Sequence, residues 1–247
     1  MGEGMDEVFE LEEVAKLRRR AREARSTPDE GPEGWSRSEI DPHDLLAVFE
    51  PLRVKSGFAL RAYLFRSGGN GNGVVWAVPD DAPFRKPEES PEDSFSPVPG
   101  VVLSSPRPSE ALDDLMEAIE GNGSPWSYLC ASLFAREATE FGALWHGVSW
   151  DETAIVGGDP FGGGPVEVGT AGGFSARPES WTWHAEAPRE WRPAVSQREE
   201  GPEVIFHTYS AVMPETLRRH HDRYWPLGYR FSEEGEDLAS GPGGIIF

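Results

Sequence analysis

The chain has 247 residues, enough for one large domain or two small ones, and 38% of them are hydrophobic. Its formal net charge of −20 repels the phosphates of nucleic acids and anionic membrane surfaces, so we expect neither as a partner. A field of this sign attracts a basic protein, although an acidic, salt-adapted proteome accounts for the same charge without a partner. Cys130 is the only cysteine, which excludes an intramolecular disulfide and a thiolate metal cluster within one chain.

The sequence shows no pattern of a membrane anchor or an export signal. It contains no apolar run of the roughly 18 residues that a membrane-spanning helix requires. The N-terminal stretch MGEGMDEVFELEE is acidic and has neither the basic start nor the apolar centre of a signal peptide. These features predict a cytoplasmic protein.

An amphipathic helix is predicted over residues 6–25. Its acids come first and its bases last, the order that suits a helix dipole, and an apolar stripe recurs at helical spacing. We expect the basic run KLRRRAREAR to compensate the dipole and to contact the chain's own acids rather than nucleic acid. The Pro- and Gly-rich stretch 26–42 is typical of a linker. The sequence therefore predicts a weakly docked N-terminal helical arm over residues 1–30 and a single α+β domain over residues 31–247.

The first strands are predicted as an antiparallel hairpin over residues 57–79. Two apolar runs, GFALRAYLFR and GVVWAVP, flank the sequence SGGNGNG. Asn-Gly pairs supply the positive φ angles that tight hairpin turns need. The turn is therefore expected within GGNGNG, residues 68–73.

A helical pair is predicted over about residues 108–142. Residues 108–123 begin with a proline, continue with acids and end in glycines, which is the order of a well-capped helix. The second helix, over residues 124–142, has Ser124 as its N-cap and Pro125 in its first turn. Cys130 lies in the apolar pattern of this second helix, where a buried core residue is expected.

The C-terminal half is predicted to consist mostly of strands. Apolar or alternating runs indicate strands over residues 144–156, 180–187 and 203–213. Residues 214–225, PETLRRHHDRYW, begin with a proline and are predicted as a short helix, whose cationic face should pair with the chain's own acids. Strands that cluster in hairpins rather than alternate with helices favour an α+β fold with a mostly antiparallel sheet.

A glycine-rich loop, GGDPFGGGP at residues 157–165, is a candidate binding site. It contains no lysine and no helix is predicted after it, so it matches neither a phosphate-binding P-loop nor a dinucleotide fingerprint. The simplest interpretation is a connecting turn. The alternative is a binding loop in which Asp159 and Phe161 line a ligand site.

Histidines on two predicted strands form a candidate metal site. In WTWHAE, alternation places His184 and Glu186 on one face and Trp181 and Trp183 on the other, where we expect the tryptophans to be buried. If the strand that carries His207 is a neighbour, two imidazoles and a carboxylate converge there. Such a set binds a divalent transition metal such as iron or zinc. The alternative is a solvated sheet face that binds nothing.

Two classes of function remain open. Short nucleophile and metalloprotease motifs are absent from the sequence, and its nine tryptophans exceed what a core of this size should hide, so some are expected at a groove or an interface. The composition therefore favours a non-catalytic, acidic interaction protein whose partner is unknown. The alternative is a metal-dependent or small-molecule enzyme with its site near His184, Glu186 and His207.

Overall fold

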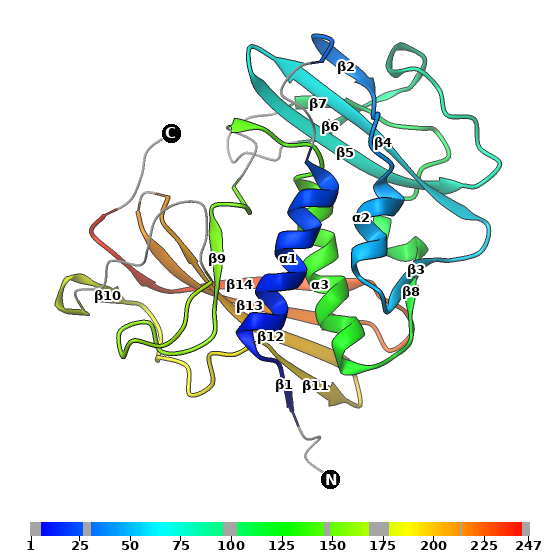
Figure 1. The fold of residues 1–247 in the computed structure, drawn as a ribbon. Helices are drawn as coiled ribbons and strands as arrows, with labels where there is room; N and C mark the ends of the chain where they lie inside the picture. Colours follow the sequence, from blue (N-terminus) through cyan, green and yellow to red (C-terminus); the bar gives the residue numbers. More distant parts are fainter. Residues whose placement is uncertain are drawn as a thin grey trace.

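The computed structural model of the chain describes residues 6–26, 31–95, 103–145, 149–167, 178–212 and 214–243. These residues form an α+β fold with mostly antiparallel sheets (Figure 1), as the sequence predicts. Its α-helices are α1 (Leu11–Arg25), α2 (Pro42–Val48) and α3 (Pro125–Thr139). Within the described ranges, no helix has the length and the apolar character needed to cross a membrane.

The strands form one large sheet and three small ones. The large sheet has the order β1-β11-β12-β13-β14-β10. Strand β9 also pairs with β12, along its second half, where β11 no longer pairs with it. The small sheets are β2-β4-β5, β3-β8 and β6-β7. The strands are β1 (Glu7–Val8), β2 (Gly34–Arg37), β3 (Leu52–Val54), β4 (Phe58–Ser67), β5 (Asn70–Pro79), β6 (Glu92–Phe95), β7 (Leu103–Pro106), β8 (Ile119–Gly121), β9 (Thr153–Val156), β10 (Thr182–Trp183), β11 (Ala194–Arg198), β12 (Gly201–Ser210), β13 (Thr216–Tyr224) and β14 (Phe231–Ser240).

Helices α1 and α3 lie side by side against one face of the large sheet, and the β4-β5 hairpin lies near one end of them (Figure 1). The main core extends from the hairpin through the helices to the sheet and includes Leu60, Phe134 and Phe206. A smaller core on the opposite face of the sheet includes Trp181 and Tyr209. Because successive side chains of β12 point to opposite faces, this one strand contributes to both cores.

The predicted hairpin over residues 57–79 is confirmed. Ser67 pairs with Asn70, so Gly68 and Gly69 form the two-residue turn, with φ angles of 55° and 83°. The positive φ angles therefore come from the Gly-Gly pair, and both Asn-Gly pairs lie in β5 instead.

The predicted helical pair is half wrong. The second helix is present as α3, and the Ser124 side chain caps it as expected. Residues 108–123 form a 3₁₀ turn at Leu115–Ala118 followed by β8. The amide of Leu112 donates to the carbonyl of Ala77 in β5, and β8 pairs with β3. Neighbouring strands satisfy this backbone, so its local helical signals are overridden.

The predicted helix over residues 214–225 is also wrong, because this segment is β13. It lies between β12 and β14 in the large sheet, with a bulge between Leu217 and Arg218. Beyond the bulge, buried and more exposed residues alternate with a period of two. The expected pairing of its arginines with the chain's own acids is nevertheless present, at Arg218–Asp237, Arg219–Glu236 and Arg223–Glu234.

Helix α1 is part of the core, and the expectation of a weakly docked arm is wrong. Its apolar stripe is buried, and Arg18 and Arg25 are also almost completely inaccessible to solvent. Both arginines donate to Glu137 of α3, at 3.2 Å and 2.8 Å. The stretch expected to be a linker contains β2 and the start of α2, while residues 27–30 lie outside the described residues. Amphipathicity alone indicated that α1 has a buried face, and the acids of α3 provide the partner for its bases.

A buried set of charges, which we call the α1–α3 charge network, joins the two helices to the chain after α3. Its members are Arg18, Arg22, Arg25, Glu137, Glu140, Asp151 and Glu167. Its acids outnumber its bases. Burial raises the pKa of Glu140 to about 7, against a smaller opposing effect of Arg25. A proton on Glu140 would leave three acids against the three bases.

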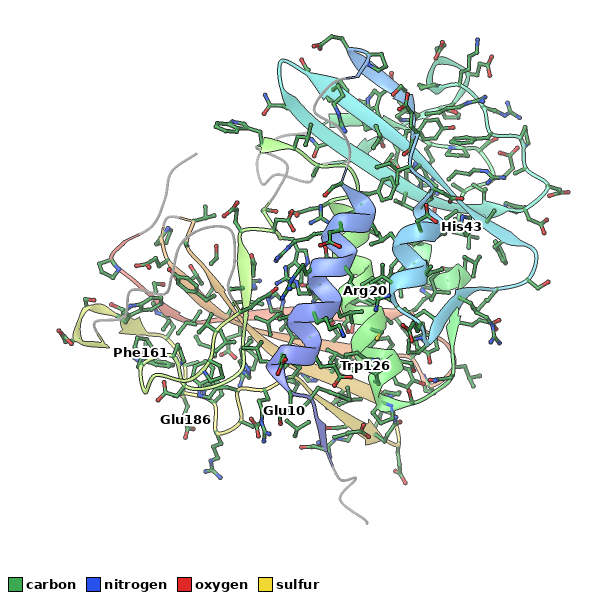
Figure 2. All side chains as sticks on the ribbon, in the orientation of Figure 1. Glu10, Arg20, His43, Trp126, Phe161 and Glu186 are labelled. Carbon is green, nitrogen blue, oxygen red and sulfur yellow. The ribbon has the colours of Figure 1, made fainter. Side chains whose placement is uncertain are left out.

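We expect Arg18→Ala to lower the free energy of unfolding by about 3–5 kcal/mol, because it leaves Glu137 and Glu167 buried without this cation. Arg20→Ala is the matched control on the same helix (Figure 2), since Arg20 has a half-exposed side chain 3.6 Å from Glu50. The control should cost less than about 1 kcal/mol. Urea unfolding measures both, and equal losses would contradict the structural role of Arg18.

Glu140→Gln tests the protonation of the network. A carboxyl whose folded pKa is about 7 stabilises the fold fully below its ordinary pKa of 4.5, and this contribution is lost as the pH rises through 7. Relative to the variant, the wild type should lose up to roughly 3 kcal/mol of unfolding free energy between about pH 5 and pH 8. Parallel pH profiles of the two proteins would show that Glu140 is ionised throughout.

Candidate functional site

The three residues of the predicted metal site do not come together. His184 follows β10, which pairs with β14, whereas His207 lies on β12. Three strand spacings, about 14 Å, separate these strands, while a zinc ion needs each nitrogen at about 2.1 Å. Glu186 is exposed on the loop after β10 (Figure 2). In the described ranges, no three His, Cys, Asp or Glu side chains are grouped so that they could hold a metal ion.

The expected facing of the β10 segment is also wrong. Trp181 is buried, but Trp183 is 38% exposed, and His184 is exposed with its ring 2.8 Å from the hydroxyl of Ser240. The strand has only two residues, so alternation does not continue to Glu186. The expectation that some tryptophans are accessible holds for Trp145, Trp183 and Trp225.

The glycine-rich loop after β9 is a self-bonded turn. The Asp159 side chain accepts from the amide of Phe161 at 3.0 Å, and the Asp159 carbonyl accepts from the amides of Gly162 and Gly164. A side chain at Gly164 would collide with the backbone of Gly158, which explains the need for glycine. The ring of Phe161 packs against two tryptophans of the β10 segment. These contacts explain Asp159 and Phe161 as turn residues, and a ligand role for either stays a prediction.

A cavity on the helix-covered face of the large sheet is the candidate site with the most hydroxyl groups in its lining. It has a volume of about 240 Å³ and combines one aromatic wall with hydroxyl groups from three strands. We call it the His220 cavity. It is lined by Trp150, Thr153, Thr208, Ser210, Thr216, Arg218, His220 and Asp237.

Two lining residues, Thr208 and His220, bring a hydroxyl next to an imidazole, and the Glu233 carboxylate lies beyond the imidazole. The Thr208 hydroxyl oxygen is 2.9 Å from Nε2 of His220, and Nδ1 of His220 is 3.5 Å from the carboxylate of Glu233. A carboxylate beside Nδ1 favours the tautomer with a proton on that nitrogen, so Thr208 donates to Nε2. Burial lowers the pKa of His220, and the nearby His220 imidazole lowers the pKa of Glu233 to about 2. The imidazole is therefore neutral at neutral pH.

Helix α3 fixes the orientation of this imidazole. Its Arg136 donates to both carboxylate oxygens of Asp222 at 2.8 Å and 2.9 Å, and lies 2.9 Å from Glu233. The ring of His220 stacks on Phe206 at 4.6 Å, and the guanidinium of Arg136 lies over the same Phe206 ring. The bidentate pair with Asp222 holds Arg136 in place over Phe206, and His220 stacks on the same ring. The stacked imidazole therefore has little rotational freedom.

The hydroxyl groups of the cavity present both donors and acceptors. Thr153 and Thr216 donate to backbone carbonyls, so their lone pairs remain for a ligand. Ser210 accepts from the amide of Val212, so its hydrogen remains. At the rim, Arg218 donates to Asp237 at 2.9 Å. The two charges neutralise each other, and the cavity as a whole is polar but uncharged.

This geometry suits binding better than covalent catalysis. A hydroxyl beside an imidazole and a carboxylate is the order found at activated nucleophiles. However, Thr208 is 2% exposed, and its hydroxyl is in the middle of a central strand, where a substrate carbon has little access. Sequence reasoning missed the site because it assigned a helical period to RRHHDRYW. A period of two places His220 and Asp222 together on one face.

His207, one of the predicted metal ligands, is buried on the opposite face of the sheet. Its Nδ1 lies 3.0 Å from the carbonyl of Trp191, and its Nε2 has no hydrogen-bond partner among the described residues. Burial lowers the pKa of His207 to about 4, and the nearby Arg219 acts in the same direction. The ring is therefore neutral, with its proton on Nδ1.

Comparisons with known proteins give no match for this architecture. No protein-family model matches the chain, no curated protein is significantly similar in sequence, and no solved structure is significantly similar in fold. The fold and the cavity therefore define the protein only as an α+β protein with a neutral, hydroxyl-lined cavity.

We expect the His207 ring to titrate near pH 4 rather than at its ordinary 6.5, because folding favours the neutral form. This contribution to stability is complete above the ordinary pKa and is lost as the pH falls toward 4. The ring-proton chemical shift of His207, followed by NMR from neutral to acidic pH, measures the midpoint. A midpoint at the ordinary value would show that the ring is solvated.

Proposed function

We propose that this protein is a non-catalytic binding protein whose ligand is a small, uncharged, polyhydroxylated molecule of about monosaccharide size. The single observation that carries the proposal is the chemistry of the His220 cavity. Its volume of about 240 Å³ is somewhat below the roughly 300 Å³ at which drug-sized sites begin, which suits a small ligand, and several of its polar groups are hydroxyls. A ligand hydroxyl both donates and accepts, so it matches a wall that offers both.

The neutrality of the cavity supports an uncharged ligand. Arg218 and Asp237 are paired with each other, and burial favours the neutral form of His220. An ionic ligand would have to break the rim pair, because no unpaired charge lines the cavity to receive it.

The basic protein partner favoured by the composition stays a prediction. The acids that β14 turns outward are already paired with arginines of β13, which weakens the attraction of this edge for a second cation. The neutral cavity therefore supports a small ligand more directly than the acidic surface supports a protein.

Titration with glucose, galactose, mannose and ribose tests the proposal, with saturation-transfer NMR to detect contact and calorimetry to measure affinity. Ser210→Ala and Thr216→Val each remove one cavity hydroxyl, and each should lower the affinity for the sugar by about 3–10-fold. Thr182→Val is the control, because Thr182 is an exposed hydroxyl residue on β10, outside the cavity. The proposal fails if none of the sugars binds, or if the cavity variants bind as the control does.

A further inference from the structure

A second cavity lies on the opposite face of the large sheet, where helices α1 and α3 do not cover it. It has a volume of about 230 Å³ and is bounded by the segment before β1, the segment before β11, and strands β12 and β13. We call it the Arg189 cavity. Its charged and ionisable lining residues are Asp6, Arg189, Glu190, Arg192, His207 and Arg219.

The charge of this lining opposes that of the chain. Three arginines and two acids line it, in a protein whose net charge is −20. Two of these arginines are already paired, Arg192 with Glu190 and Arg219 with Glu236. Both acids already have partners, since Glu190 is bonded to Arg192 and Asp6 accepts from the hydroxyl of Ser196. Arg189 is exposed and has no hydrogen bond or ion pair within the part of the chain that the structure describes. The cavity thus offers a cation to an anionic ligand.

His207 adds a requirement that a simple anion does not meet. Its Nδ1 faces a carbonyl, which only accepts, so Nδ1 must carry the proton. Nε2 is then a lone pair, and it has no partner in the described ranges although the side chain is only 2% exposed. A ligand that satisfies this buried acceptor must bring a hydrogen-bond donor.

From the joint presence of Arg189 and the unpartnered Nε2 of His207, we propose that the Arg189 cavity binds a phosphate group, either the free anion or a small monoester. Phosphate carries an O–H donor for His207 and anionic oxygens for Arg189 on one tetrahedral centre. Sulfate has the same shape and anionic oxygens but carries no proton near neutral pH. The site should therefore distinguish the two ions by the donor alone.

The test is calorimetric titration at constant ionic strength and about pH 6, where phosphate monoesters retain part of their O–H. The probes are inorganic phosphate, methyl phosphate and sulfate. We expect either phosphate probe to bind at least about tenfold more tightly than sulfate. Tighter binding of methyl phosphate assigns the site to esters, and tighter binding of inorganic phosphate assigns it to the free anion. Equal affinity for sulfate and both phosphates, or no binding of any probe, overturns the proposal.

Two variants separate the roles of the two groups. His207→Asn keeps a donor for the Trp191 carbonyl and removes Nε2, so it should abolish the preference for phosphate over sulfate. Arg189→Gln should lower the affinity for phosphate and for sulfate by a similar factor, so the preference for phosphate should remain. The controls are His184→Asn, at an exposed histidine just after β10, and Arg53→Gln, at an exposed arginine of β3. Retention of the preference in His207→Asn overturns the proposal, and if that variant does not fold, unchanged affinity in Arg189→Gln does so.

Discussion

The buried carboxylate of Glu137 is the constraint on which the arrangement of the helices depends. Three donors meet it, from Arg18 at 3.2 Å, Arg25 at 2.8 Å and the indole of Trp150 at 2.8 Å. A carboxylate in an apolar interior is tolerated only when it is paired and fully hydrogen-bonded. Helix α1 must therefore lie on α3, and the chain after α3 must return across both helices. The indole of Trp150, which is held by its hydrogen bond to Glu137, also forms the aromatic wall of the His220 cavity.

The pairing of β12 with β13 creates two chemically different environments from one strand pair. Phe206 and His220 pair across the strands and face the helices, while His207 and Arg219 pair one position further along and face the other side. Both imidazoles are held neutral by burial, but they differ in their partners. His220 lies between a hydroxyl and a carboxylate, whereas His207 has a carbonyl on one nitrogen and an open lone pair on the other.

Local signals predicted the elements whose backbone is satisfied within the element itself. The hairpin over residues 57–79, helix α3 and the helical character of α1 all follow from turn glycines, caps and an amphipathic stripe. The failures at residues 108–123 and 214–225 share a different cause. In both, neighbouring strands satisfy the backbone, and helix-like caps or a run of charged residues concealed the period of two.

The sequence by itself determined that this is an acidic α+β protein with a mostly antiparallel sheet, because composition, turn residues and strand clustering are local properties. Only the tertiary structure decided which polar side chains meet. β13 and β14 separate β10, which His184 follows, from β12, which carries His207, while Thr208, His220 and Glu233 come together from three adjacent strands. Strand order and register fix these neighbours, and both are set by burial and backbone pairing between segments far apart in the chain.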